Sequence, residues 1–530
     1  MKLIINNQKL LLFSILVLAA VLRLVAITKS PPSLYWEEAA IGYDAYSILK
    51  TGKDYHGNAF PLIAFPSFGD YKPSLYFYAT VPSIAIFGLN DFAIRFPSAF
   101  SGVLTVLLVY LISKELFKSK SKIPLLASFL LAISPWHLQF SRAGFEVNLA
   151  TFLLTLGIYF LIKSLKNNFY FFLGAVVLGL SLYAYHGLRI IAPIFALIFT
   201  LTNWSKINFK WKIVSVIVAL IISWPILGNI NNPQVKQRFQ ETSHFTQSSA
   251  INISNQLKEQ DDNLISRLIH HRYILWGREL LQNYTNHFNL NFLFISGDNN
   301  PRHQTREFGL LYHWELITLF SAIYFFIKRK HFFLNPIFLW ILVAPTAAML
   351  TKTTPHTLRF LPAAPAFAII SAYGLIQLLK NIKLPKTFII LGTSTIILAE
   401  AIVFLHFYFF HYPQVTSQHW QYGYKQLIQF TESVKDNYTS IYITREYGRP
   451  SVYALLYGQY DPLTIQKQEP SLPKDQLELL SFDKYKFTPA KQDDTNILVV
   501  TATDQPQSNR KLIKTIDFLD HSTAFFIYEQ

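Results

Sequence analysis

Two adjacent carboxylates, Glu37 and Glu38, stand in the stretch PSLYWEEAAIGYDAYS (residues 32–47), shortly after an apolar run that ends at Ile27. Charges at the edge of an apolar segment are costly, and such groups in membrane proteins mark functional sites. Nothing in WEEAA offers either side chain a local counter-charge. We interpret at least one of them as functional, because a positioned carboxylate can act as a general base.

Further polar residues occupy the same kind of position, in loops and at the ends of apolar runs. They are Asp44, Asp70, Lys72, Arg142, Glu146, His186, Arg189, Asp298, Arg302, His303, His356 and Arg359. If these loops share one side of a membrane, the residues would line a cavity of mixed charge at the boundary between membrane and water.

Most of these residues also have a structural interpretation. Arg189 and Arg359 could place their charges among lipid headgroups. Arg142 and Glu146 are spaced for an ion pair on one helix face. The three histidines could be hydrogen-bonded structural residues, and Asp298 could shape the GDNN turn.

A carboxylate facing cations at a bilayer edge suits sugar transfer from a lipid phosphate. Arg and Lys would hold the phosphate and stabilise the charge that develops as it leaves. The carboxylate would take the proton of an acceptor hydroxyl as that oxygen attacks the anomeric carbon. This single displacement inverts the anomeric centre. The sequence has no convincing Walker or dinucleotide-binding motif.

Composition places these residues in a membrane protein. The chain has 530 residues, of which 51% are hydrophobic, and its mean hydropathy is positive. Apolar runs of about 20 residues recur, the length of a helix that crosses a bilayer. There are no cysteines, which excludes disulfides, iron–sulfur clusters and thiol catalysis. The net charge of +16 is typical of basic cytoplasmic loops.

We predict a polytopic all-α membrane protein with about eleven spans. They are 10–28, which we interpret as a retained span and not a signal peptide, 94–117, 123–140, 147–163, 169–185, 188–202, 211–228, 308–327, 333–350, 358–379 and 387–410.

Lysine placement predicts the orientation of these spans. With the N-terminus in the cytoplasm, the short loops 118–122, 163–168, 205–212, 328–331 and 380–386 face inward, and all are rich in lysine. The apolar segment 73–88 is short and contains Pro82, and counting it as a span would reverse every later loop. We therefore predict that it is an interfacial or re-entrant helix.

The outer side then carries loops 29–93 and 229–307 and a tail. Within the second loop, NLISRLIHHRYILWGRELL predicts a helix on the membrane surface. In the tail, one helical pattern and three strand-like runs (SIYITREY, TNILVVTA and STAFFIYEQ) predict a small α/β extracytoplasmic domain. We expect a transmembrane domain over 1–410 and the α/β domain over 411–530.

The block PSLYWEEAAIGYDAYS, followed by FGDYKPSLYFYATVPSIAIFGLNDFAIRFPSAFSG, resembles the C-type membrane glycosyltransferases. The nearest branch comprises the bacterial relatives of protein O-mannosyltransferases (glycosyltransferase family 39) and the lipid A aminoarabinose transferases. SRAGFEVNLA, SGDNNPRH, PHTLRFLPAAPA and HWQYGYKQL extend the resemblance. It implies a polyprenyl-phosphate-linked sugar donor, a bacterial plasma membrane location and an active site on the outer face.

The resemblance also implies roles for single residues. Glu37 stands where the family usually has Asp as the base, and Glu38 matches the supporting acid. Lys72 and Arg142 match residues expected near the carrier phosphate, and Glu146 matches a second acidic position. Arg302, His303, His356 and Arg359 follow as further substrate contacts. If residues 35–48 begin a helix, Glu37 and Glu38 point in different directions, so we expect only Glu37 to act as base.

Several alternatives stay open at the level of sequence. A transporter or lipid flippase would also be polytopic, although its polar residues would lie near the bilayer midplane. An enzyme that uses a diphosphate-linked donor and a non-catalytic scaffold are further alternatives. No cofactor is certain, but Glu37, Glu38, Glu146 and Asp298 could supply oxygen ligands to a divalent cation. The acceptor could be a protein, a lipid or a glycan, and the sequence names neither it nor the sugar.

Overall fold

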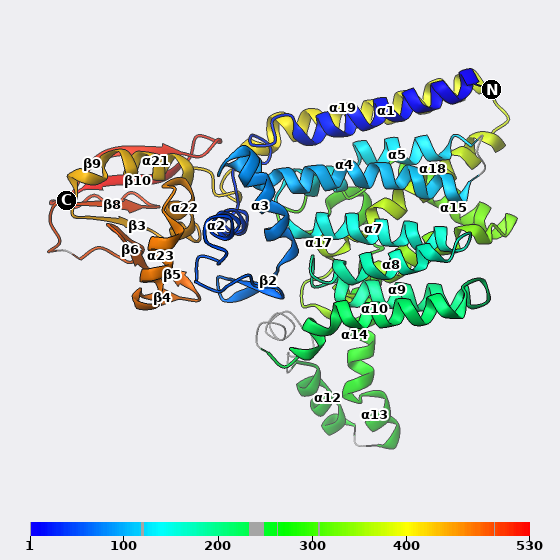
Figure 1. Ribbon diagram of the computed structural model, residues 1–530, viewed down its shortest axis with the longest axis horizontal. Helices are drawn as coiled ribbons and strands as arrows, with labels where there is room; N and C mark the ends of the chain where they lie inside the picture. The colour runs from blue at the N-terminus through cyan, green and yellow to red at the C-terminus, as the bar shows by residue number, and fades with distance from the viewer. Residues whose placement is uncertain (1, 118–120, 233–248, 262, 306–307, 492) are drawn as a thin grey trace. The chain divides into compact units, whose positions relative to one another are not determined.

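The computed structural model describes residues 2–117, 121–232, 249–261, 263–305, 308–491 and 493–530 (Figure 1). Contacts divide the chain into two compact units. The first comprises residues 1–22, 102–140 and 147–401, and the second comprises residues 23–101, 141–146 and 402–530. The second unit therefore joins the first predicted outer loop with the C-terminal tail. The predicted division of the chain at residue 410 stays a prediction.

The first unit is helical. The α-helices that lie wholly within it are α5 (Ile123–Ile133), α8 (Phe169–Ser181), α9 (Leu188–Thr202), α10 (Phe209–Gly228), α12 (Ser249–Gln260), α13 (Leu264–Ile269), α14 (Arg272–Asn286), α15 (Glu315–Arg329), α16 (Asn335–Val343), α17 (Thr357–Phe360) and α18 (Ala364–Asn381). The unit also contains the greater part of five further helices, which are α1 (Lys2–Leu24), α4 (Asp91–Leu116), α6 (Pro135–Arg142), α7 (Glu146–Ser164) and α19 (Lys386–His406). In Figure 1, α7, α8, α9 and α10 run roughly parallel.

Helices lie at all eleven predicted span positions. Among the described residues, seven helices are long and apolar enough to cross a membrane, and α5 with α6, bent by 56° between Ile133 and Pro135, makes an eighth if the pair is counted as one span. α8, α9 and α15 are shorter than the other spans. The prediction of a multi-pass membrane protein is confirmed, while its orientation stays a prediction. Residues 118–120 of the lysine-rich loop 118–122 lie outside the described residues, as do residues 233–248 of the loop 229–307.

Two predicted helices have different boundaries in the structure. The span expected from residue 308 begins at Glu315, because the chain over 308–314 forms bends and turns and Leu311 N–H donates to the Leu293 carbonyl over 2.8 Å. The surface helix expected over 264–281 is two helices, α13 and α14. His271 separates them as the N-cap of α14, its ring accepting from the backbone N–H of Tyr273. Leu264 and Leu268 are more than 60% exposed, which agrees with a helix that contacts membrane.

The second unit contains the helices α2 (Trp36–Thr51), α3 (Leu75–Phe87), α20 (Tyr412–Thr416), α21 (Tyr424–Val434), α22 (Pro450–Tyr457) and α23 (Pro462–Gln468). α3 occupies the segment that we predicted to be interfacial or re-entrant. Two short hairpins pair β1 (Ala64–Ser67) with β2 (Asp70–Pro73) and β4 (Lys474–Asp475) with β5 (Glu478–Leu479).

A six-stranded sheet has the order β6-β7-β3-β8-β10-β9. Its strands are β3 (Ser440–Ile443), β6 (Ser481–Phe482), β7 (Tyr485–Lys486), β8 (Ile497–Thr501), β9 (Lys511–Asp517) and β10 (Thr523–Glu529). β3 is parallel to β7 and β8, with Ile441 opposite Leu498, and β10 is antiparallel to β8. All residues of β3 and β8 are buried, as expected for central parallel strands. The predicted α/β character of the tail is confirmed.

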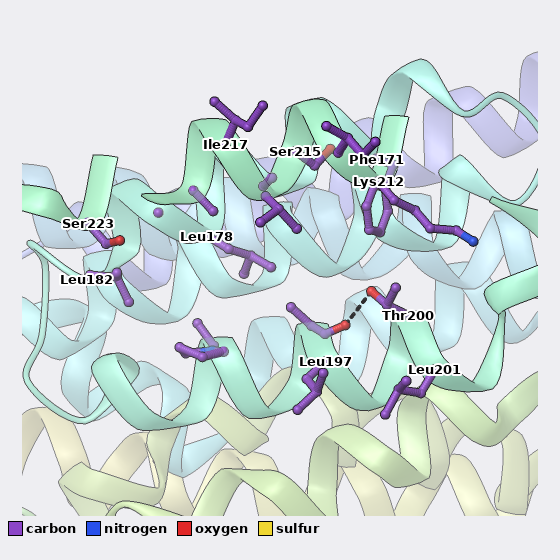
Figure 2. A pocket seen from close by; sticks show the side chains of 18 of the residues that line it. Phe171, Leu178, Leu182, Leu197, Thr200, Leu201, Lys212, Ser215, Ile217 and Ser223 are labelled. Atoms are coloured by element: carbon purple, nitrogen blue, oxygen red, sulfur yellow. Dashed lines mark hydrogen bonds between the residues drawn. The ribbon is translucent and has the colours of Figure 1, made fainter. Parts of the chain in front are cut away.

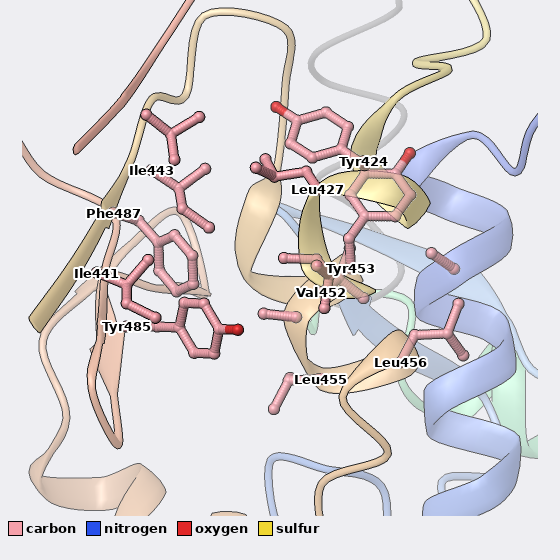
Figure 3. Close-up of a cluster of buried hydrophobic side chains, with 14 of the residues drawn as sticks. Tyr424, Leu427, Ile441, Ile443, Val452, Tyr453, Leu455, Leu456, Tyr485 and Phe487 are labelled. Atoms are coloured by element: carbon pink, nitrogen blue, oxygen red, sulfur yellow. The ribbon is translucent and has the colours of Figure 1, made fainter. Parts of the chain in front are cut away.

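The core of this unit joins the sheet to helices from the N-terminal part of the chain. Tyr424 of α21 stacks on Tyr453 of α22 with ring centroids 4.5 Å apart, and Ile441 and Phe487 face them from the sheet (Figure 3). Ala39 of α2 belongs to the same buried cluster. α2, which carries the two adjacent carboxylates, is therefore fixed in position by the C-terminal domain.

Candidate active site

Glu38 is a fully buried acceptor whose two oxygens receive four hydrogen bonds. Oε2 accepts from the Tyr35 backbone N–H over 2.9 Å, which caps the first turn of α2. Oε1 accepts from the Gly144 backbone N–H over 2.6 Å. The guanidinium of Arg95 donates to both oxygens, over 2.8 and 3.0 Å. The carboxylate thus joins three segments of the second unit and has no free oxygen directed to an acceptor.

Arg95, the partner of Glu38, is also fully buried and uses all five of its N–H groups. Besides the two bonds to Glu38, it donates to the carbonyls of Ile27 and Pro31, each over 2.8 Å, and to that of Ser33. The sequence analysis missed this residue. The signal was its place in α4, since an arginine inside a candidate span needs a buried partner.

Glu37 is the exposed member of the acidic pair. Its side chain is 29% exposed, and its Oε1 lies 2.8 Å from Nζ of Lys72 on β2. The same Nζ lies 3.5 Å from Oδ2 of Asp70, so one ammonium group serves two carboxylates. A neighbouring ammonium favours the charged form of a carboxylate, which is the form that a general base requires. Glu146, half-buried, begins α7 and belongs to the same unit.

Arg142 is buried at the end of α6, where the backbone surrounds it. Its guanidinium donates to the carbonyls of Ser30, Val25 and Ala26 over 2.9, 2.9 and 2.8 Å. It also lies 4.6 Å from the ring centroid of Phe409. These contacts fix the chain that leads from α1 to α2, and the predicted phosphate contact of Arg142 stays a prediction.

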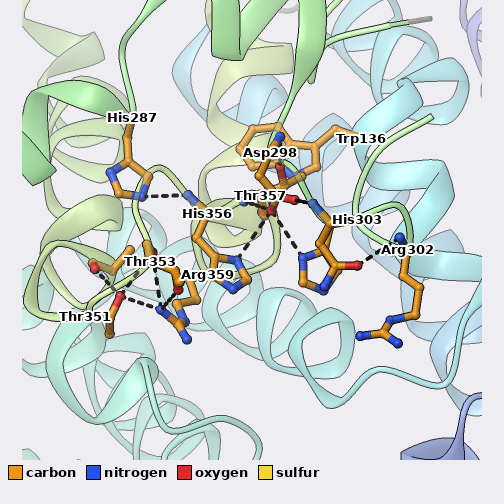
Figure 4. A network of polar contacts seen from close by, with 12 residues as sticks. Trp136, His287, Asp298, Arg302, His303, Thr351, Thr353, His356, Thr357 and Arg359 are labelled. Carbon is orange, nitrogen blue, oxygen red and sulfur yellow. Dashed lines mark hydrogen bonds and ion pairs between the residues drawn. The ribbon is translucent and has the colours of Figure 1, made fainter. Parts of the chain in front are cut away.

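The first unit brings together Asp298, His303 and His356 (Figure 4). Nδ1 of His303 lies 3.2 Å from Oδ2 of Asp298, and Nδ1 of His356 lies 3.7 Å from the same oxygen. The backbone N–H of Asn300 donates to Oδ1 over 2.8 Å, and that of Thr357 donates to Oδ2 over 2.9 Å. Burial alone would raise the pKa of Asp298, but the hydrogen bond from His303 lowers it below its usual value.

The two arginines near this cluster contact different segments. The carbonyl of Arg302 accepts from Nε2 of Gln139 over 2.7 Å. Nη1 of Arg359 donates to the hydroxyls of Thr351 and Thr353, the latter over 3.1 Å. Burial and the charge of Arg359 together lower the pKa of His356 well below its ordinary value.

Arg189, on α9, lines an apolar cavity of about 690 Å³ between α8, α9 and α10 (Figure 2). Its Nε donates to the Leu182 carbonyl over 3.3 Å. Lys212, from the start of α10, lines the same cavity and lies 3.5 Å from the ring centroid of Trp204. His186 is half-buried in the turn that precedes α9.

Within each unit the structure therefore gathers part of the predicted set. Lys72 contacts both Glu37 and Asp70 in the second unit, and Asp298, His303 and His356 gather in the first. Asp44 is buried in α2, where its Oδ1 accepts from the Tyr55 backbone N–H over 3.1 Å. The substrate roles of all these residues stay predictions.

Comparison with known families points to one class of protein. Residues 71–228 match the family model described as dolichyl-phosphate-mannose-protein mannosyltransferase. The Bacillus subtilis (strain 168) protein YkcB, provisionally named a mannosyltransferase, is 30% identical over 182 residues, which cover 32% of this chain and 24% of that protein. The chain thus spans about a quarter of this curated relative.

Solved structures extend the likeness to the whole fold. ArnT from Cupriavidus metallidurans bound to undecaprenyl phosphate has a TM-score of 0.53 at 11% identity and 98% coverage of both chains. The archaeal oligosaccharyltransferase AglB from Archaeoglobus fulgidus, in complex with an inhibitory peptide and a dolichol-phosphate, has a TM-score of 0.51 at 15% identity, covering 84% of this chain and 63% of that one. The predicted resemblance to the C-type membrane glycosyltransferases is confirmed by the family model over residues 71–228, and the solved structures show a similar fold.

Proposed function

We propose that this protein is an inverting glycosyltransferase that moves a sugar from a polyprenyl-phosphate carrier to an acceptor hydroxyl at the outer membrane face. The observation that carries the proposal is the division of the acidic pair. The Glu38 carboxylate accepts hydrogen bonds from Arg95 and two backbone N–H groups, while Glu37 stays partly exposed beside Lys72. A base and a phosphate-binding cation are thereby adjacent in one unit.

In the proposed reaction, the acceptor oxygen bonds to the anomeric carbon as the bond from that carbon to the phosphate oxygen breaks. The acceptor proton passes to the Glu37 carboxylate, and the phosphate leaves on its polyprenyl carrier. Lys72, 2.8 Å from Glu37, would stabilise the charge that grows on the departing phosphate. The extra methylene of Glu, where the family has Asp, lengthens the reach of the base.

The carrier and the acceptor are proposed from relatives. ArnT was solved with undecaprenyl phosphate and AglB with a dolichol-phosphate and a peptide. The apolar cavity between α8, α9 and α10, with Arg189 on its wall, suits the isoprenoid part of such a carrier. No cofactor is established. Of the four acids that we predicted as oxygen ligands of a divalent cation, Glu38 is the least suited, because its oxygens already accept four hydrogen bonds.

The test is to offer the purified full chain a panel of radiolabelled polyprenyl-phosphate sugars and to follow release of the carrier. We expect turnover with one donor and little with the rest, and a product of inverted anomeric configuration. A chain that turns over no donor but moves lipid or sugar across sealed vesicles would instead be a transporter.

A further inference from the structure

Asp298, His303 and His356 form a three-residue group whose ligand-type atoms all lie within 4.8 Å of one another. In the part of the chain that the structure describes, no other group of three histidines and carboxylates is so gathered. Asp298 and His303 come from the loop after the short π-helix Phe292–Ser296, and His356 is the N-cap of α17. Two separate segments therefore converge on one point (Figure 4).

The distances within this group match those between ligands of one metal ion. Zinc lies about 2.0–2.2 Å from imidazole nitrogen and carboxylate oxygen, so neighbouring tetrahedral ligands are about 3.3–3.5 Å apart. The two Nδ1 atoms, of His303 and His356, lie 3.2 and 3.7 Å from Oδ2 of Asp298. A small shift of either ring would place all three atoms around one ion.

His356 supplies a second, independent observation. Its Nδ1 is buried and, among the described residues, has no hydrogen-bond partner. A neutral imidazole protonated on Nε2 would direct the lone pair of this nitrogen at the Asp298 carboxylate, and the two negative ends would repel each other. A cation between them would turn that repulsion into two bonds.

The surroundings hold the Asp298 carboxylate and the backbone of His356 in place. The backbone N–H groups of Asn300 and Thr357 fix the Asp298 carboxylate over 2.8 and 2.9 Å. The backbone N–H of His356 donates to Nε2 of His287 over 3.3 Å. Such supporting bonds are what orient ligands in metal sites.

We propose that Asp298, His303 and His356 bind a first-row divalent transition metal, with zinc as the expected ion. Two imidazoles and one carboxylate are a ligand set that zinc accepts, and three protein ligands leave a fourth position for water or an anion. Magnesium and calcium prefer oxygen ligands and would bind weakly. The ion would replace the proton that His303 Nδ1 shares with Asp298. The proposal does not depend on the transfer reaction.

The test measures metal on the full chain in detergent, without donor or acceptor. After chelator treatment, Zn²⁺ is titrated by equilibrium dialysis and metal analysis, and Co²⁺ binding is followed by its visible spectrum. We expect stoichiometric Zn²⁺ uptake, a tetrahedral Co²⁺ spectrum, and at least about tenfold weaker binding in Asp298→Asn and in His356→Gln. His331→Gln is the matched control, since that imidazole contacts Tyr373 and not the triad.

Asp298→Asn keeps the size of the side chain and one acceptor oxygen, for the N–H of either Asn300 or Thr357, so we expect it to fold. His303→Gln provides a further variant should His356→Gln fail to accumulate. Equal Zn²⁺ uptake by the wild type and the triad variants would overturn the proposal, as would no uptake above the background of the buffer. Because no sugar donor is present, either result leaves the proposed transfer reaction untouched.

Discussion

Glu37 and Glu38 are neighbours in sequence with different surroundings. Adjacent helical residues point about 100° apart. Glu38 therefore points into the interior of the second unit, toward Arg95, while Glu37 points toward Lys72. The Glu38 carboxylate is fully buried and accepts four hydrogen bonds, whereas Glu37 is 29% exposed beside the Lys72 ammonium. We therefore expect Glu37, and not Glu38, to be the carboxylate that can contact a substrate.

Substitution of Lys72 tests whether this residue binds the donor phosphate beside Glu37. Lys72→Met should lower kcat/KM for the lipid-linked donor by about 10- to 100-fold, because a charge-assisted bond to phosphate contributes about 1.5–3 kcal/mol. Lys72→Arg should retain much of the activity. Initial rates against donor concentration measure the effect, and Lys166→Met, which alters an exposed lysine, is the control. An unchanged donor dependence in Lys72→Met would exclude the residue from phosphate binding.

At the scale of elements, the Glu38–Arg95 pair joins α2 to α4 and to the chain after α1. Removing one member of a buried ion pair typically costs about 3–5 kcal/mol, because the other charge is left buried. We expect Arg95→Met to lower the thermal unfolding temperature strongly, and Glu38→Gln/Arg95→Met to recover part of the loss.

The exposed pair of Lys166 and Glu115, 2.6 Å apart, gives the matched control. Glu115→Gln should change the stability by less than about 1 kcal/mol. Similar melting curves for Arg95→Met and Glu115→Gln, recorded in the same detergent, would show that the buried pair is not a structural clamp.

The contact between α15 and α18 depends on a small residue. A Cβ at Gly374 would lie 1.8 Å from the Thr318 carbonyl oxygen, so these helices approach through backbone, as small residues allow in membranes. Gly374→Ala should therefore destabilise the protein by about 1–3 kcal/mol. Gly392→Ala on α19 has nothing within 4 Å of its added carbon and should be neutral or slightly stabilising. Thermal unfolding of both variants decides, and equal stability would contradict the close packing.

At the scale of the whole molecule, orientation is the prediction with the widest consequences. The chain contains no cysteine, so single cysteines can be introduced without background labelling. In intact cells, an impermeant thiol reagent should label Gln505→Cys in the C-terminal domain but leave Lys166→Cys and Lys330→Cys unlabelled until the cells are lysed. The reverse pattern would place Glu37 on the cytoplasmic side and exclude a reaction at the outer face.

Much of the fold was predictable because its signals are local. Apolar runs predicted the positions of the spans, and runs rich in β-branched and aromatic residues predicted β3, β8 and β10. The boundaries were less predictable. The helix expected from residue 308 begins later because Leu311 bonds to Leu293, a contact that no local pattern reveals.

The residues of the candidate site could be predicted from their types and positions, but the contacts between them could not. Glu37 and Glu38 were singled out because they are charged and stand at the edge of an apolar segment. Their different roles were predicted from the different directions of adjacent helical residues. Arg95 was missed because its partner lies 57 positions away. The convergence of Asp298 with His356 likewise depends on how the π-helix Phe292–Ser296 and α17 pack, and no local sequence pattern reveals that packing.

The most direct test of the account compares Glu37→Gln with Glu38→Gln in single-turnover release of polyprenyl phosphate from the accepted donor. Removing a general base should slow Glu37→Gln by about 10²- to 10⁴-fold at unchanged unfolding temperature. Glu38→Gln should chiefly lower stability. Equal, mild losses of rate in the two variants would contradict Glu37 as the base.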